Sequence, residues 1–142
     1  MSNLPVVDDY MAKVLYTFLP SDNIHSAAKT LLEKHISGAP VVDESGNLVG
    51  VLSKKDCLNV VYAASYHQDW GGRVDEYMNR EVRTIESGTD IIAVADMLVQ
   101  SSYRRFPVLA NGHMIGQISR HDILRALYDQ WPVAEKVKAK SK

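Results

Sequence analysis

The chain has 142 residues, of which 46% are hydrophobic and 23% charged, and its formal net charge is −1. These values exclude a disordered chain and a strongly basic nucleic-acid-binding protein, and they allow one domain or two small halves. No run approaches the roughly 20 apolar residues of a membrane span, and the first residues lack the pattern of a signal peptide. The single cysteine, Cys57, cannot form an internal disulfide, and we expect a cytoplasmic protein.

An internal repeat organises the sequence. The segment Val7-Asp8-Asp9-Tyr10-Met11 recurs as Val74-Asp75-Glu76-Tyr77-Met78, at an offset of 67 residues that becomes 66 after a turn in the second half of each copy. We therefore predict a first copy with an N-terminal leader over 1–65, a linker over 66–73, a second copy over 74–130 and a basic tail over 131–142.

Each copy predicts the element order strand–helix–strand–strand–helix, and therefore a mixed α/β fold of the α+β class. An extended segment, 16–19 or 83–86, leads through turn and N-cap residues into a helix with apolar residues at i, i+3, i+4 and i+7. Two apolar runs, 39–42 and 48–52 in the first copy, flank a glycine-bearing turn and predict a hairpin. A final helix begins near Ser53, and its counterpart follows in the second copy.

Polar residues gather where these final helices begin. Ser53-Lys54-Lys55-Asp56 and Ser119-Arg120-His121-Asp122 share an S-x-x-D pattern that is close to a capping box. Capping does not explain the cations between Ser and Asp, because the helix dipole disfavours positive charge in the first turn by up to about 1 kcal/mol. A bound phosphate would reverse that cost. Arg104-Arg105, where the first copy has Ser37-Gly38, is either a phosphate contact or an exposed pair at a helix end.

In order and repetition, these segments resemble a tandem pair of cystathionine β-synthase (CBS) domains, a Bateman module, over about residues 7–128. The matching segments are Gly38 to Asp43, Leu48 to Asp56, Tyr103 to Leu109 and Met114 to Asp122. The resemblance implies two β-α-β-β-α units packed through their sheets about a pseudo-twofold, with ligand clefts at the junction, and commonly a flat homodimer. Members of the family mostly bind AMP, ADP, ATP or S-adenosylmethionine and act as sensors.

The resemblance also suggests roles for single residues. It implies that Asp122 accepts hydrogen bonds from ribose hydroxyls, whereas for Asp56 a ribose contact and a simple cap both remain open. It implies that the arginine pair contacts phosphate. The pair can belong to either cleft, because each cleft in this family is built from residues of both copies. The resemblance also implies that adenine contacts residues of the early strands and of an apolar wall. The alternative is that these residues are ordinary core residues. The expected ligand-binding residues are Thr17, Phe18, Gly38, Ala39, Pro40, Ser53, Lys54, Lys55, Asp56, Thr84, Ile85, Arg104, Arg105, Phe106, Pro107, Ser119, Arg120, His121 and Asp122.

We therefore expect a free-standing regulatory module that binds an adenosine nucleotide and changes conformation or dimer packing for an effector protein that the sequence does not name. The alternative is a structural or dimerisation module with degenerate clefts, because the first copy lacks the arginine pair. The sequence contains no catalytic constellation and no histidine or cysteine pair at zinc spacing. We expect no enzyme, no metal cofactor, and no nucleic-acid or membrane partner.

Overall fold

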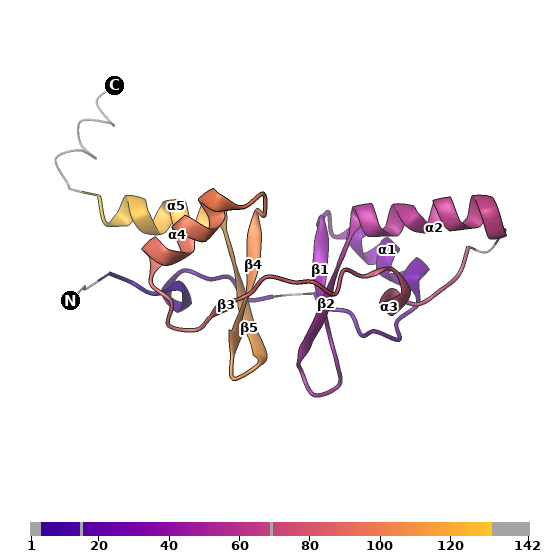
Figure 1. Ribbon diagram of the computed structural model, residues 1–142, viewed down its shortest axis with the longest axis horizontal. Coiled ribbons are helices and arrows are strands. Elements are labelled where there is room, and N and C mark those ends of the chain that lie inside the picture. The colour runs from indigo at the N-terminus through magenta and orange to yellow at the C-terminus, as the bar shows by residue number, and fades with distance from the viewer. Residues whose placement is uncertain (1–3, 15, 69, 132–142) are drawn as a thin grey trace, which may run out of the picture. The chain divides into compact units, whose positions relative to one another are not determined.

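The computed structural model describes residues 4–14, 16–68 and 70–131, so the predicted basic tail lies outside the described residues after Trp131. The elements in chain order (Figure 1) are η1 (Val7–Asp9), α1 (Ile24–Glu33), β1 (Gly38–Val42), β2 (Leu48–Ser53), α2 (Lys54–His67), α3 (Val74–Tyr77), β3 (Ile85–Glu86), α4 (Ile91–Gln100), β4 (Arg105–Ala110), β5 (His113–Ser119) and α5 (Arg120–Asp129). Strands β1 and β2 form an antiparallel pair, and β3, β4 and β5 form a sheet in that order. The predicted mixed fold with two repeats is confirmed.

The two amphipathic helices bury the faces that their spacing predicts. Helix α1 buries Ile24, Ala27 and Leu31, and α4 buries Ile91, Val94 and Leu98. Side chains cap both N-termini, because Asn23 accepts hydrogen bonds from the N–H groups of His25 and Ser26, and Asp90 accepts one from Ala93. Apolar periodicity and capping together position these helices on their sheets.

The strand predicted at residues 16–19 is reduced to a single parallel bridge between Phe18 and Val41. Its counterpart β3 makes two pairs with β4, and the N–H of Ser87 extends the ladder by donating to the carbonyl of Leu109 at 2.8 Å. Pro20 occupies the position of Ser87 in the first repeat and has no N–H to donate. The first-repeat ladder therefore ends earlier.

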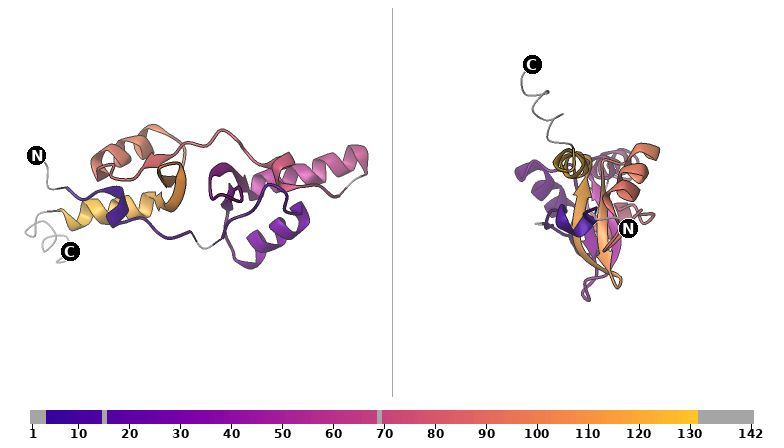
Figure 2. Two further views of the ribbon diagram at one scale, coloured as in Figure 1. Left: turned by 90° about the horizontal axis from the view of Figure 1, so that it is seen from below. Right: turned by 90° about the vertical axis from the view of Figure 1, so that its left-hand side faces the viewer.

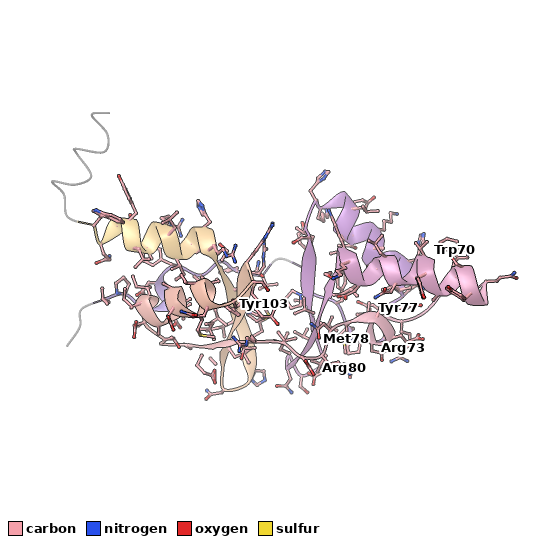
Figure 3. The ribbon with its side chains drawn as sticks, turned by 45° about the horizontal axis from the view of Figure 1, so that its top comes forward. Trp70, Arg73, Tyr77, Met78, Arg80 and Tyr103 are labelled. Atoms are coloured by element: carbon pink, nitrogen blue, oxygen red, sulfur yellow. The ribbon has the colours of Figure 1, made fainter. Side chains whose placement is uncertain are left out.

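Helix α2 extends beyond the end expected for it. It runs to His67, two residues into the predicted linker, and Gln68 ends it in a left-handed conformation with φ of 54°. The matching helix α5 has 10 residues against 14 in α2. Trp70 follows with 65% of its surface exposed, and Arg73 is the N-cap residue of α3 (Figure 3). The described part of the linker is therefore shorter than the sequence pattern indicates.

The chain forms two compact units that cut across the repeats. We call one the second-repeat unit; of the described residues it contains 4–13, Thr84–Ala110 and 115–131. The other, the first-repeat unit, contains Val14–Arg83 and Asn111–Met114. The opening segment of each repeat thus belongs to the unit that holds the rest of the other repeat.

The N-terminal leader, residues 5–12, is an integral part of the second-repeat unit. In Figures 1 and 2 its indigo ribbon lies alongside the yellow helix α5. Val7 is completely buried in that unit's core, and its N–H donates to the carbonyl of Thr89 at 2.7 Å. Ala12 and Gln117 exchange two backbone hydrogen bonds of 2.9 Å each. The leader therefore supplies both core and edge pairing to this unit.

Helix α3 and the residues after it play the same part in the first-repeat unit. Val74 is completely buried in that unit's core, and its N–H donates to the carbonyl of Asp22 at 2.8 Å. Asn79 and Val51 exchange two backbone hydrogen bonds of 2.9 Å. The exchange of opening segments is therefore reciprocal, which the repeat pattern alone did not indicate.

Candidate functional site

Both S-x-x-D turns form complete capping boxes. At the start of α5, the hydroxyl oxygen of Ser119 accepts from the N–H of Asp122 at 3.2 Å, and Oδ2 of Asp122 accepts from the N–H of Ser119 at 3.0 Å. At the start of α2, Ser53 and Asp56 make the same two bonds at 3.1 and 2.9 Å. The capping role considered for these residues is therefore present in both repeats.

Capping leaves part of the Asp122 carboxylate uncommitted. The side chain is half-buried, and Oδ1 has no hydrogen-bond partner in the described part of the chain. The backbone N–H of His121 likewise has no acceptor there, whereas the N–H of Arg120 donates to the carbonyl of Arg104 at 3.0 Å. This turn therefore combines a carboxylate oxygen that can accept from hydroxyl groups with an N–H that can donate to an anion.

Exposed cations surround this turn. The bond from Arg120 to the carbonyl of Arg104 brings the residue before β4 against the first turn of α5. Arg104, Arg105, Arg120 and His121 are all exposed, and no ion pair is found for Arg104 or Arg105 among the described residues. The Arg120 guanidinium makes a long 3.5 Å contact with the carbonyl of Ser101. Positive charge thus gathers at a helix N-terminus, where the dipole disfavours it in the absence of an anion.

The first repeat has the same backbone geometry with less positive charge. The N–H of Lys54 donates to the carbonyl of Ser37 at 2.9 Å, and Lys54 and Lys55 are exposed. A Cβ atom on Gly38, which matches Arg105, would lie 2.9 Å from the carbonyl oxygen of Leu52 and 3.2 Å from the Cα of Ser53. A side chain at position 38 would require the backbone to move, so packing excludes an arginine pair here.

The residues expected to meet adenine differ in accessibility. Phe106 is completely buried, and Ile85, Phe18 and Ala39 are 2%, 5% and 3% exposed. Pro40 and Pro107 are also buried, whereas Thr84 is half-buried and Thr17 is exposed. The apolar residues among them are core residues, which is the alternative role given for them above. Their contact with an adenine ring stays a prediction.

The expected ligand-binding residues of each repeat lie together in one unit. All those of the second repeat, from Thr84 to Asp122, lie in the second-repeat unit, and all those of the first repeat, from Thr17 to Asp56, lie in the first-repeat unit. Each unit therefore carries one half-site, made of an early strand, the hairpin and the S-x-x-D turn. The second-repeat half-site is the more cationic of the two.

The sequence did not lead us to expect that the exchanged opening segments pack on the strands ahead of the S-x-x-D turns. Added Cβ atoms would lie 2.8 Å from the Met11 sulfur at Gly116 and 2.7 Å from the Met78 sulfur at Gly50, so each methionine packs directly on a glycine. Figure 3 places Met78 beside the first-repeat strands. Glycine within a strand signals close approach by another segment, and this signal could have revealed the contact.

The described residues offer little for other chemistry. No group of three or more His, Cys, Asp or Glu side chains among them could hold a metal ion. Burial and the neighbouring Asp56 raise the pKa of the half-buried Cys57 thiol, which packs against the first-repeat core. None of the helices within the described ranges combines the length and apolar character needed to cross a bilayer.

Comparison with known sequences identifies the repeats. The profile of the CBS domain matches residues 6–63 and 74–129, which together make up most of the chain. The chain belongs to the CBS domain family. Its two CBS domains follow one another in tandem, and the resemblance noted from the sequence motifs is confirmed.

Relatives and solved structures agree with this assignment. The uncharacterized protein MJ1225 of Methanocaldococcus jannaschii is 28% identical over 125 residues, which are 88% of this chain and 44% of that protein. The chain therefore spans less than half of that relative. The CBS-pair protein CBSX2 of Arabidopsis thaliana, solved in complex with AMP, has a TM-score of 0.75 and 28% identity, covering 87% of this chain and 96% of that one.

A second solved CBS pair carries other adenosine-containing ligands. The CBS domain pair of protein MJ0100, solved with methylthioadenosine and S-adenosyl-L-methionine, has a TM-score of 0.69 and 26% identity. It covers 90% of this chain and 99% of that chain. The tandem CBS architecture is thus shared along nearly the whole length of these two solved structures.

Proposed function

We propose that this CBS pair is a regulatory module that binds an adenosine nucleotide (AMP, ADP or ATP) and does not catalyse a reaction. The observation that carries the proposal is the second S-x-x-D turn, where half-buried Asp122 keeps one carboxylate oxygen uncommitted next to exposed Arg104 and Arg105. Support also comes from two similar CBS pairs, one solved with AMP and one with methylthioadenosine and S-adenosyl-L-methionine.

The proposed contacts follow the chemistry of the groups. Oδ1 of Asp122 would accept hydrogen bonds from the ribose 2′- and 3′-hydroxyls while Oδ2 remains in the cap. The planar guanidinium groups of Arg104 and Arg105 suit phosphate oxygens, and a phosphate would offset the unfavourable placement of cations at the start of α5. In the first repeat, Asp56 with Lys54 and Lys55 forms a weaker version of the same site.

Regulation requires two states that the ligand distinguishes. We propose that nucleotide binding shifts the arrangement of the two CBS domains, or their packing in a dimer, and that an effector protein in the cytoplasm reads the change. By linkage, if bound nucleotide raises the affinity for the effector by some factor, the effector must raise the affinity for the nucleotide by the same factor. This reciprocity gives an independent measurement once an effector is identified.

An Asp122→Asn variant is expected to bind nucleotide at least about tenfold more weakly, equivalent to about 1.4 kcal/mol, while keeping its thermal stability. Asparagine Oδ1 can still accept from the N–H of Ser119, so the cap survives, but the negative acceptor for the ribose hydroxyls is lost. Isothermal calorimetry with AMP, ADP, ATP and S-adenosylmethionine at up to millimolar concentration measures the affinity.

Asp56→Asn is the matched control for this variant, because it makes the same change in the other capping box. A smaller loss of affinity in Asp56→Asn would agree with the lower charge of the first-repeat half-site. Equal affinity of Asp122→Asn and the unaltered chain would reduce Asp122 to a helix cap. If none of the four compounds gives heat or a thermal shift with the unaltered chain, the sensor proposal is wrong.

A second candidate function is homodimerisation through helix faces, and one surface feature favours it. Helices α4 and α5 of the second-repeat unit form an apolar groove of about 350 Å³, whose lining residues include Leu98, Val99, Leu124 and Leu127. Val99 is 79% exposed and Leu124 is 64% exposed. Exposed apolar surface of this kind marks protein–protein contacts.

Sedimentation equilibrium is expected to show a dimer that a Leu124→Asp substitution converts to monomer, because the new carboxylate would lose its hydration in an apolar contact. The matched control is Leu58→Asp, since Leu58 is its repeat counterpart on α2 and is 66% exposed. A monomer in the unaltered chain at all concentrations would contradict the dimerisation proposal. Dimer formation without any nucleotide binding would favour it over the sensor.

A further inference from the structure

The leader of the second-repeat unit contacts the strand that carries the candidate ligand-binding turn. Ala12 exchanges two backbone hydrogen bonds of 2.9 Å with Gln117 on β5. Gln117 lies two residues before Ser119, the first residue of the S-x-x-D turn. Met11 packs on Gly116 of the same strand. The leader therefore fixes the strand immediately ahead of the turn.

The leader also holds the helix that follows the turn. The Tyr10 hydroxyl donates to Oδ2 of Asp129 in the last turn of α5 at 2.7 Å. The guanidinium carbon of Arg125, on the same helix, lies 5.4 Å from the centre of the Tyr10 ring. Because a helix of this length moves as a rigid element, a contact at its last turn restrains its first turn as well.

A third contact reaches the two residues that follow β3, the strand expected to meet adenine. The carboxylate of Asp8 accepts from the Ser87 hydroxyl and, at 2.7 Å, from the N–H of Gly88. These two hydrogen bonds lower the pKa of Asp8, since both favour the ionised carboxylate. The leader thus contacts the turn that follows β3 and the elements β5 and α5, close in sequence to Ile85 and to Ser119 to Asp122.

The other opening segment shares the backbone contact, and its helix α3 packs on α2, but within the described residues it has no side-chain hydrogen bond to that helix. Asn79 pairs with Val51 ahead of the first S-x-x-D turn, as Ala12 does with Gln117. The hydroxyl of Tyr77, which matches Tyr10, has no hydrogen-bond partner within the described ranges, and Ala63 stands where Asp129 stands in the second repeat. Among the described residues, a side-chain hydrogen bond from the opening segment to the final helix is therefore found only in the second-repeat unit.

We propose that docking of the leader and nucleotide binding at the second-repeat half-site are thermodynamically coupled, so that the leader positions the ligand-binding turn and reports its occupancy. This inference rests on the proposed function. A nucleotide that orders the β5–α5 turn lowers the cost of docking the leader on the same strand and helix. The coupling is reciprocal, so loosening the leader must weaken nucleotide binding by the same factor. Tyr10 and Asp8 are positioning residues in this scheme.

The test compares Tyr10→Phe with the matched control Tyr77→Phe in the full chain. Tyr10→Phe removes the hydrogen bond to Asp129 and keeps the ring beside Arg125. Hydrogen exchange measured with and without ATP or AMP should show at least about threefold slower exchange of amides 6–12 and 115–119 when nucleotide is bound. Calorimetry should show nucleotide affinity about three- to tenfold lower in Tyr10→Phe, and unchanged within about twofold in Tyr77→Phe.

Each outcome decides the coupling. If the unaltered chain binds nucleotide but leader exchange does not change and Tyr10→Phe binds equally well, the coupling is wrong while the proposed function stands. If the unaltered chain binds neither ATP nor AMP, the coupling and the proposed function are both wrong. Calorimetry of the unaltered chain is enough to distinguish this case from the first. If Tyr10→Phe does not fold, Asp8→Asn decides, because it weakens the leader at Ser87 and Gly88 and is expected to lower affinity in the same way.

Discussion

A Phe106→Ala substitution is expected to lower the free energy of unfolding of the second-repeat unit by about 3–5 kcal/mol, the range for removing a fully buried aromatic ring. Phe106 has no exposed surface and packs in a core cluster with Val7, Ile85, Ile91 and Ile118. The loss is a large fraction of the roughly 5–15 kcal/mol that stabilises a typical domain. Urea unfolding followed by circular dichroism should show a separate early transition.

Tyr103→Ala is the matched control, because the Tyr103 ring packs at a tilt against Phe106 with ring centres 5.6 Å apart and yet is 41% exposed. Figure 3 shows it at the sheet end of α4. Its removal should cost about 0.5–1.5 kcal/mol, the usual value of an aromatic pair. A similar loss in both variants would mean that Phe106 is not the centre of the core.

A Gly116→Ala substitution is expected to destabilise the second-repeat unit by about 1–3 kcal/mol, as overpacking commonly does. The added Cβ would lie 2.8 Å from the carbonyl oxygen of Ala12 and 2.8 Å from the sulfur of Met11. The methionine can move aside, but the oxygen belongs to the backbone that pairs with Gln117. Leader pairing must therefore stretch or break, and amides 6–12 should exchange faster with deuterium.

A double variant separates the two contacts. Adding Met11→Ala to Gly116→Ala removes the sulfur and leaves the carbonyl oxygen of Ala12 in place, so leader exchange should stay fast. Gly50→Ala makes the same change in the first-repeat unit, where Cβ would meet Met78 and the carbonyl oxygen of Asn79, and its effect should be confined to that unit. Unchanged exchange of amides 6–12 in Gly116→Ala would contradict the packing of the leader on β5.

The inequality of the two half-sites has a packing cause. Arg105 begins β4 with an exposed side chain, whereas Gly38 begins β1 where Leu52 and Ser53 leave no room for a Cβ. An arginine at position 38 would therefore require the backbone of the first repeat to move. We expect nucleotide to fill the second-repeat half-site first.

The sequence alone determined the repeat, the family resemblance and most of the local structure. Apolar spacing defined α1 and α4, and the S-x-x-D pattern located the start of α2 and α5 at the observed residues. These features depend on interactions between residues a few positions apart, which a linear pattern records directly. The cationic residues between Arg104 and Asp122 could be recognised from the sequence for the same reason.

Only the tertiary structure decided where the opening segments pack. The leader and α3 are copies of one motif, and nothing in their residues indicates that each joins the unit of the other repeat. That choice depends on contacts between distant segments, such as Met11 on Gly116 and Tyr10 with Asp129. The short ladder at Phe18 depends on both, because Pro20 in the sequence has no N–H to donate, whereas the bridge itself needs Val41 from a distant strand as its partner.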